Sequence, residues 1–386
     1  METRTMAADI AVSERTVATP VTREIPDKNA GGRLVSLDAY RGLIMLLLVS
    51  HALGLIEART TILQSYPQLS WLTVQVDHSE WTGVTLWDLI QPAFTFMVGV
   101  AMPFAFARRI SKGATFPQLF RHVAWRSLML LVLSNVLSNF DSGRSHPQLQ
   151  FINVLCQIAF GYMICFLITR LRFSYQVICA IAMLAGYWAL FVLFPGPQGA
   201  FSKVGNIGQV IDLHVLGYNY PEYYTTINFI GNAATILFGY WAGMLLQSHR
   251  SQSSKLKVLA IAAVTGFVLG LALEPFNPMV KRLWTVSFTF FSAGWVILML
   301  IVFYWLIEMK QIKRWAFPMI VVGMNSIFIY SFSQVLRGWL NQGLKVFTGN
   351  FSFMGGFGAI PQNILVLLVM WYVCLWLYQR KIFIKI

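Results

Sequence analysis

The chain has 386 residues, of which 57% are hydrophobic, 15% are aromatic and only 11% are charged. Soluble globular domains carry about 25% charged residues, so this composition excludes an ordinary soluble protein. The net charge of +14 would suit a nucleic-acid partner, but the basic residues lie mostly in short loops between apolar runs. That distribution is typical of the cytoplasmic loops of membrane proteins, and it argues against nucleic-acid binding.

The first 32 residues are polar and contain no apolar core of a signal peptide. We expect residues 1–32 to form a disordered cytoplasmic tail and residues 33–386 to form one membrane domain. Four cysteines fall inside apolar runs without metal-type spacing, so we expect buried small hydrophobic residues and no metal site. They are Cys156, Cys165, Cys179 and Cys374.

Apolar runs close to 20 residues recur along the rest of the chain, and each is long enough to cross a bilayer as a helix. The sequence therefore predicts an all-α polytopic membrane protein with about ten transmembrane helices. The predicted spans are 40–57, 86–108, 121–139, 150–169, 174–194, 225–247, 256–274, 284–308, 316–337 and 360–379.

The basic residues predict the orientation of these spans. With the N-terminus inside, 22 of the 29 lysines and arginines fall in inner segments and 7 in outer ones, as the positive-inside rule requires. We therefore expect both termini to be cytoplasmic and His78 to lie on the outer face. The expected location is a membrane, with membrane lipid as a partner.

The stretch Asp77–Gly99 joins a polar loop to an apolar helix that carries one carboxylate, Asp88. Thr85 and Asp88 have the spacing of a helix-capping box, and a carboxylate at a helix start can also orient an imidazole. His78 itself has two interpretations: an interfacial histidine that packs beside Trp81, or a titratable group at a functional site.

Polar residues gather toward the outer ends of several spans. Gln150, Asn153 and Gln157 share one helix face, His51 ends the first span, and Asn325 lies in the ninth. Polar groups within a membrane face the bundle or a wet cavity. They can form an outward-facing polar pocket, or they can only bind helices to one another.

Three smaller patterns complete the reading from residues alone. Lys281 and Arg282 are adjacent basic residues on the outer side, which suits either a snorkelling helix anchor or a contact to an anion such as a phosphate. Asp38 and Arg41 lie one helical turn apart and are expected to form an ion pair. Gly239 and Gly243 form a small-xxx-small motif, typical of a helix-packing seam.

Five motifs occur in an order that resembles one known family. They are SLDAYRG (36–42), HSEWTGVTLWDLIQPAFTFMVG (78–99), INVLCQIAFGY (152–162), KRLWTVSF (281–288) and VGMNSIFIY (322–330). Together they resemble the heparan-α-glucosaminide N-acetyltransferase family of multi-span proteins over about residues 33–380. The resemblance implies that acetyl-CoA is supplied from the cytosol and that an amino sugar is acetylated on the other face. Because the family includes many bacterial members, the resemblance implies a bacterial cytoplasmic membrane as the location, and dimerisation is a family expectation.

The resemblance also assigns roles to residues. The family's active-site histidine falls on His78, its motif aspartate on Asp88 and the asparagine of its G-M-N-S motif on Asn325, which we therefore expect to be catalytic. Imidazole can act as the general base or can itself be acylated, and both routes stay open. Lys281, Arg282 and Gln157 are expected to contact acetyl-CoA. The acceptor, a sugar or glycan, is expected to contact Asp77, Trp81, Gln150, Asn153 and His51.

The chain departs from the family pattern at several positions. Gln150 and Gln157 stand where the family often has arginines, which weakens the case for anion contacts there. The large N-terminal domain of the animal enzymes is also missing from this sequence, so we expect an envelope sugar or a lipid-linked glycan as the acceptor. Two alternatives remain: a transporter of a sugar or lipid-linked glycan, and a structural subunit without activity.

Overall fold

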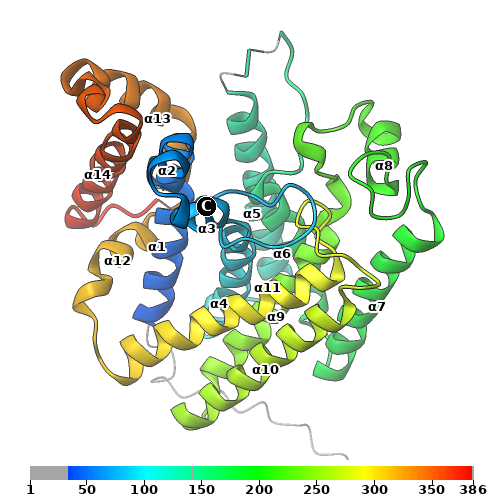
Figure 1. Cartoon of the computed structure of the whole chain (residues 1–386). Helices are drawn as coiled ribbons and strands as arrows, with labels where there is room; N and C mark the ends of the chain where they lie inside the picture. Colours follow the sequence, from blue (N-terminus) through cyan, green and yellow to red (C-terminus); the bar gives the residue numbers. More distant parts are fainter. Residues whose placement is uncertain (1–33, 141, 144, 385–386) are drawn as a thin grey trace, which may run out of the picture.

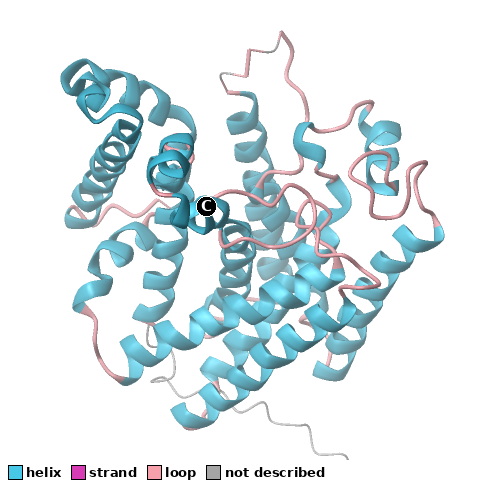
Figure 2. Ribbon diagram, in the orientation of Figure 1, coloured by secondary structure: helices cyan, strands magenta, loops and turns pink. Residues whose placement is uncertain are grey.

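The structure is a computed structural model that describes residues 34–140, 142–143 and 145–384. Over these residues it contains fourteen α-helices and no β-strand, which confirms the all-α class (Figures 1 and 2). The predicted tail, residues 1–32, lies outside the described residues.

Ten of the helices have 15 residues or more, and four are shorter. The long helices are α1 (Val35–Ser50), α4 (Ile90–Ile110), α5 (Phe116–Asn139), α6 (Val154–Ile168), α7 (Phe173–Leu193), α9 (Phe229–Gln247), α10 (Gln252–Leu273), α11 (Val286–Tyr304), α13 (Ser326–Thr348) and α14 (Ala359–Gln379). The short helices are α2 (Arg59–Ser65), α3 (Ser70–Gln75), α8 (Ile207–Leu216) and α12 (Phe317–Met324).

Each predicted span overlaps one of the ten long helices. Seven helical segments within the described residues are long and apolar enough to cross a membrane, and further apolar helices are shorter. The polytopic character is therefore shown, whereas the count of ten crossings stays a prediction. One predicted span, 316–337, is wrong as a single helix, because the backbone of Asn325 leaves helical geometry and separates α12 from α13.

Glycines allow the central helices to pack backbone against backbone. A Cβ on Gly99 of α4 would lie 2.0 Å from the carbonyl oxygen of Ile236, and one on Gly239 of α9 would lie 2.1 Å from that of Phe96. Gly243 packs against Val100 in the same way. The structure thus places the predicted glycine motif in a seam between α4 and α9, as is common in membrane bundles.

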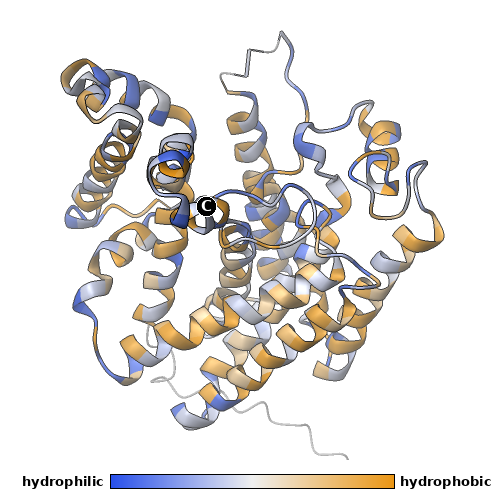
Figure 3. Cartoon of the chain, in the orientation of Figure 1, coloured by the Kyte–Doolittle hydropathy of each residue, from blue (hydrophilic) through white to orange (hydrophobic). Residues whose placement is uncertain are grey.

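The segments 51–89 and 274–285 lie at the same end of the bundle, because the Gly83 N–H donates to the Met279 carbonyl oxygen at 2.9 Å and Lys281 contacts His78. We call this end the His78 end. The start of α1 lies toward the other end, where Asp38 and Arg41 form the predicted ion pair, 3.8 Å apart. Hydrophobic residues cover much of α7 and α10, while hydrophilic residues concentrate in the loops (Figure 3).

Candidate active site

The carboxylate of Asp88 organises the loop at the His78 end. Asp88 is completely buried, and its Oδ2 accepts hydrogen bonds from the backbone N–H groups of Ser79 and Thr85, both at 3.2 Å, and from Thr85 Oγ1 at 3.1 Å. The Asp88 N–H lies 3.4 Å from Thr85 Oγ1 in return. These are the contacts of the predicted capping box. They leave Oδ1 available for a different partner.

That partner is the imidazole of His78. Its Nδ1 lies 2.8 Å from Asp88 Oδ1, and 37% of the His78 side chain is exposed. An ionised carboxylate accepts a hydrogen bond, so we assign the proton to Nδ1 and the lone pair to Nε2. A base oriented by a buried carboxylate is the arrangement found in catalytic triads.

A third side chain, from far along the chain, lies at the same point. Lys281 Nζ lies 3.4 Å from Asp88 Oδ1, and 3.0 Å and 3.4 Å from the two ring nitrogens of His78. The Lys281 side chain is only 6% exposed. Two opposite charges are thus buried together, so each compensates the burial of the other.

A tight turn places Lys281 there. The Trp284 N–H donates to the Lys281 carbonyl at 2.9 Å, and Trp284 adopts a positive φ of 53°. Its indole is fully buried and donates to Thr235 of α9 at 3.2 Å. The aromatic anchor therefore fixes the turn against the bundle and points the lysine at the histidine.

The neighbouring Arg282 holds the His78 loop closed. Its Nη1 donates to the carbonyl oxygens of Ser79 and Glu80 at 2.8 and 2.6 Å. The indole of Trp81 donates to the carbonyl oxygen of Phe201 at 2.9 Å. Arg282 and Trp81 were predicted to contact ligands. In the structure both side chains donate to backbone carbonyl oxygens and so stabilise the conformation of the loop.

Amides extend the site into the bundle. Gln157 donates to Asn228, and Asn228 donates to the Arg282 carbonyl oxygen at 3.2 Å. Asn232, one turn further along α9, is fully buried, and neither of its side-chain polar atoms has a hydrogen-bond partner among the described residues. The Gln157 side-chain oxygen is unpartnered within the same part of the chain. Such groups are costly to bury unless a ligand or water binds them.

The structure brings some predicted residues together and leaves others apart. Asp77 lies beside the cluster, where it accepts from the His78 N–H at 2.7 Å and pairs with Arg59 at 3.4 Å. Asn153 instead caps α6 and accepts from Tyr330 at 2.9 Å.

Three further predicted residues are not joined to the cluster. Gln150 takes part in the junction of α5 and α6, where its N–H donates to Asn135 at 2.8 Å. His51 ends α1 with a positive φ of 48°, and no hydrogen bond given for the described residues links it to His78. Asn325 binds the C-terminal segment, through the backbone of Ile382 and Ile384 at 3.0 and 2.9 Å.

A cavity of about 250 Å³ lies within the bundle, and we call it the central cavity. It extends along α4 from Phe94 to Ala105, and Arg41, Arg126 and Ile384 also line it. A helix rises about 1.5 Å per residue, and Phe94 follows Asp88 by six residues. The end of the central cavity at Phe94 therefore lies roughly 9 Å from Asp88 along the helix axis.

Arg126 was not among the site residues predicted from the sequence. It lies ten residues from the first residue of α5, its guanidinium is 5.0 Å from the centre of the Tyr162 ring, and its Nε has no hydrogen-bond partner among the described residues. An arginine inside a predicted span is itself the missed signal, because charges within a membrane usually mark a ligand or ion path. Asn228 and Asn232, four residues apart at the start of an apolar span, gave a weaker signal of the same kind.

The fold and the site define an integral multi-pass helical membrane protein with a histidine–aspartate–lysine cluster, in which the aspartate and the lysine are buried. No family model matches the chain. The chain is similar to the heparan-α-glucosaminide N-acetyltransferase of Mus musculus, with 22% identity over 377 residues that cover 81% of this chain and 55% of the relative. It is similar also to that of Homo sapiens, with 23% identity over 418 residues, covering 92% and 60%.

The chain spans less than two thirds of the length of both relatives. Identities of this size support a distant relationship to an N-acetyltransferase, which agrees with the resemblance found in the motifs.

Proposed function

We propose that this protein is a membrane acetyltransferase that moves an acetyl group from acetyl-CoA to an amino sugar or a sugar hydroxyl. The observation that carries the proposal is the 2.8 Å contact between His78 Nδ1 and the buried Asp88 carboxylate, with Lys281 beside both. The distant similarity to two N-acetyltransferases supports the acyl-transfer class. The positive-inside count supports an outer position for His78 and a cytosolic source for the donor.

His78 is the group proposed to move the proton. Acetyl-CoA supplies a thioester, whose C–S bond breaks when the acceptor attacks the carbonyl carbon. Nε2 of His78 takes the proton from the attacking amine or hydroxyl, and Asp88 holds the ring so that Nε2 faces the acceptor. In the alternative route Nε2 itself attacks first and carries the acetyl group. Lys281 neutralises the Asp88 carboxylate in its buried position.

The central cavity supports a route for the donor. Arg41 and Arg126 line it, and the unpartnered Nε of Arg126 suits an anionic group such as a phosphate. Its volume of about 250 Å³ lies just below the range of about 300–1,000 Å³ for common ligand sites, so it suits part of acetyl-CoA and not the whole. We propose that the pantetheine arm enters here and passes near the side-chain oxygen of Gln157 and the side-chain amide of Asn232, which have no hydrogen-bond partner among the described residues.

Transfer of label tests the proposal. The purified full chain would be reconstituted in vesicles with radiolabelled acetyl-CoA and a panel of amino sugars, and wild type compared with His78→Ala. We expect His78→Ala to lower the rate by about 10²–10⁴-fold, as loss of a general base does. His249→Ala, at an exposed position between α9 and α10, is the matched control and should keep the wild-type rate.

Two outcomes would contradict the proposal. Equal transfer by wild type and His78→Ala would remove His78 from the reaction. Uptake of an amino sugar without any transfer of label would favour the transporter alternative. Mass spectrometry of the protein after a short exposure to acetyl-CoA alone separates the two routes, because only the acyl-carrier route adds an acetyl group to His78.

A further inference from the structure

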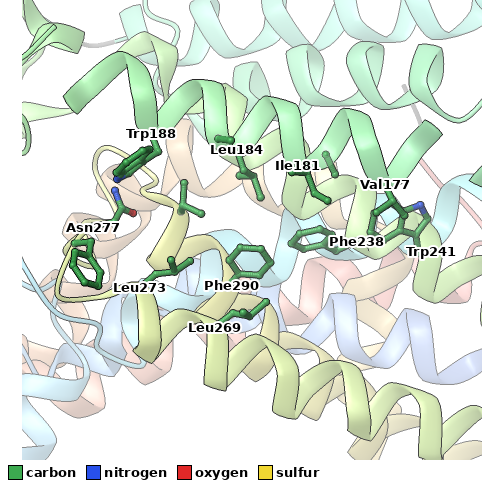
Figure 4. Close-up of a pocket in the computed structure, with 14 residues that line it drawn as sticks. Val177, Ile181, Leu184, Trp188, Phe238, Trp241, Leu269, Leu273, Asn277 and Phe290 are labelled. Atoms are coloured by element: carbon green, nitrogen blue, oxygen red, sulfur yellow. The ribbon is translucent and has the colours of Figure 1, made fainter. Parts of the chain in front are cut away.

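A second hollow lies on the side of the bundle, between α7 and α10, and we call it the lateral groove. Its volume is about 660 Å³, and α9 and α11 form its floor. α7 and α10 belong to the least buried of the apolar segments, so the groove faces the surroundings of the bundle. Figure 4 shows it as a trough with Trp188 and Asn277 at one end and Val177 and Trp241 at the other.

The lining is chemically suited to a hydrocarbon chain. Leu184, Leu273 and Phe290 are typical of its fourteen residues, and Asn277 supplies the one side-chain amide among them. From Val177 to Trp188 the helix rises roughly 16 Å, which is about half of a 30 Å hydrocarbon core. The Asn277 side chain is buried, and its Oδ1 accepts from the Ser287 N–H at 3.0 Å, so the lining that faces a ligand is apolar. The groove therefore has the length and the chemistry of one leaflet's lipid tails.

The end of the groove at Asn277 lies close to the candidate active site. Lys281 lies four positions after Asn277, so their Cα atoms are at most about 14 Å apart. The intervening Met279 accepts a hydrogen bond from Gly83 of the His78 loop at 2.9 Å. A chain lying in the groove thus ends next to the two loops that carry Lys281 and His78.

A second set of contacts joins the wall of the groove to those loops. Tyr187, next to Trp188 in α7, donates to the Leu283 carbonyl oxygen at 2.5 Å. Tyr187, Leu283 and Val280 form one apolar cluster, against which Trp81 of the His78 loop packs. The position of the groove relative to the cluster is therefore fixed by packing and not only by chain length.

We propose that the lateral groove binds the hydrocarbon chain of a lipid-linked acceptor and so presents its sugar to His78. The inference rests on the proposed acetyl transfer and names its acceptor class. Lipid tails are as apolar as the groove, so burial alone does not favour the groove over the bilayer. What the groove supplies is position, because a tethered sugar has a high effective concentration at the site.

A groove-filling substitution tests this inference. Ala185 lines the groove and is exposed, so Ala185→Trp fills the space without disturbing the core. The full chain in phosphatidylethanolamine–phosphatidylglycerol vesicles would be given acetyl-CoA with hexadecyl glucosaminide or methyl glucosaminide. We expect Ala185→Trp to lower kcat/KM for the hexadecyl acceptor by about tenfold or more, while the methyl acceptor stays within about twofold of wild type.

The control is Ala182→Trp, on the same helix at an exposed position outside the groove. It should leave both acceptors as in wild type. An equal loss for both acceptors in Ala185→Trp, or no loss for either, would overturn the inference. Failure of wild type to acetylate any acceptor would contradict the proposed function instead, and binding would then decide the inference.

Binding is measured without acetyl-CoA by photo-crosslinking. Hexadecyl glucosaminide with a diazirine in its chain should label peptides of α7 and α10 in wild type and in Ala182→Trp, and much less in Ala185→Trp. A diazirine phosphatidylglycerol at the same mole fraction should label these peptides several-fold less. Equal labelling by the phospholipid would mean that ordinary membrane lipid fills the groove, and the inference would be wrong.

Discussion

The His78 cluster and the central cavity both contain charged groups inside the protein, but the two regions differ in whether those charges are paired with opposite charges. In the cluster, Asp88 and Lys281 lie 3.4 Å apart and each compensates the other. In the cavity, Arg126 packs on the Tyr162 ring, and its Nε has no hydrogen-bond partner among the residues that the structure describes. A cluster whose charges are paired can move a proton, whereas a half-buried guanidinium with an unpartnered Nε is suited to an anionic ligand.

This contrast separates two roles that the sequence had merged. Lys281 was predicted to contact acetyl-CoA, and the structure gives it Asp88 and His78 as neighbours instead. We therefore propose chemistry at the His78 end and donor binding in the central cavity. Substitutions in the two regions should consequently change different kinetic constants.

The largest expected effect is that of Asp88→Asn. The amide can present an N–H to His78 and disturb its tautomer, so kcat should fall by about 10²–10⁴-fold with little change in KM for acetyl-CoA. Steady-state kinetics in vesicles measures both constants. Asp77→Asn, which alters a neighbouring carboxylate bound to Arg59 and to the His78 N–H, should lower kcat by less than about tenfold. Similar losses in the two variants would mean that Asp88 has no special role.

The second effect concerns stability. Lys281→Met leaves the Asp88 charge buried without its partner, which should cost about 3–5 kcal/mol. The double variant Asp88→Asn with Lys281→Met removes both charges and should recover more than half of that loss. Thermal unfolding of the detergent-solubilised protein measures the difference. Additive losses would show that the two residues are not coupled.

The third effect falls on the central cavity. Arg126→Ala should raise KM for acetyl-CoA by about tenfold, the worth of one charge-assisted hydrogen bond, and change kcat little. Arg121→Ala removes an exposed arginine from the same helix and should leave both constants unchanged. A fall in kcat alone in Arg126→Ala would contradict the separation of roles.

A smaller effect is expected at Asn325. Its amide holds the C-terminal segment that lines the cavity, so Asn325→Ala should raise KM for acetyl-CoA by about threefold and not act on kcat. Asn325→Asp, which keeps one acceptor oxygen for the Ile384 N–H, should have a smaller effect on KM. A fall in kcat of a hundredfold would instead support the catalytic role predicted from the motif.

The smallest effect is a pH dependence at the rim of the His78 end. Burial raises the pKa of the Asp212 carboxyl in α8, which accepts from the Thr226 N–H at 2.9 Å. The folded state then holds the proton more tightly than the unfolded state, so stability falls as pH rises from the ordinary value of about 3.9 through the raised pKa. Asp212→Asn should flatten that slope in thermal unfolding. An unchanged slope would exclude Asp212 as its source.

The sequence predicted the helices and half of the cluster. Hydropathy located nine of the ten long helices and the first half of α13, because apolar length is a local property of the chain. The His78–Asp88 contact was also within reach, since ten residues of loop and a capping box hold both groups at one helix start. The five motifs are also local sequence patterns, so the sequence alone was sufficient to indicate the resemblance to the relatives.

The remaining features depend on contacts between distant segments. Lys281 reaches His78 across 203 positions in the chain, and a turn closed by Trp284 is not visible in hydropathy. Asn325 falls in an apolar run, yet its break arises from bonds to the C-terminal segment. Whether a charged side chain is paired, as in the cluster, or keeps an unpartnered nitrogen, as in the cavity, depends on the packing of distant segments. No local sequence pattern could have predicted that difference.

A sided transfer assay tests the central claim most directly. Vesicles would enclose glucosamine, with radiolabelled acetyl-CoA added only outside, and the enclosed sugar would then be analysed. The account predicts labelled N-acetylglucosamine inside the vesicles for wild type and about 10²–10⁴-fold less for His78→Ala. Product that forms only when both substrates are on the same side of the membrane would contradict it.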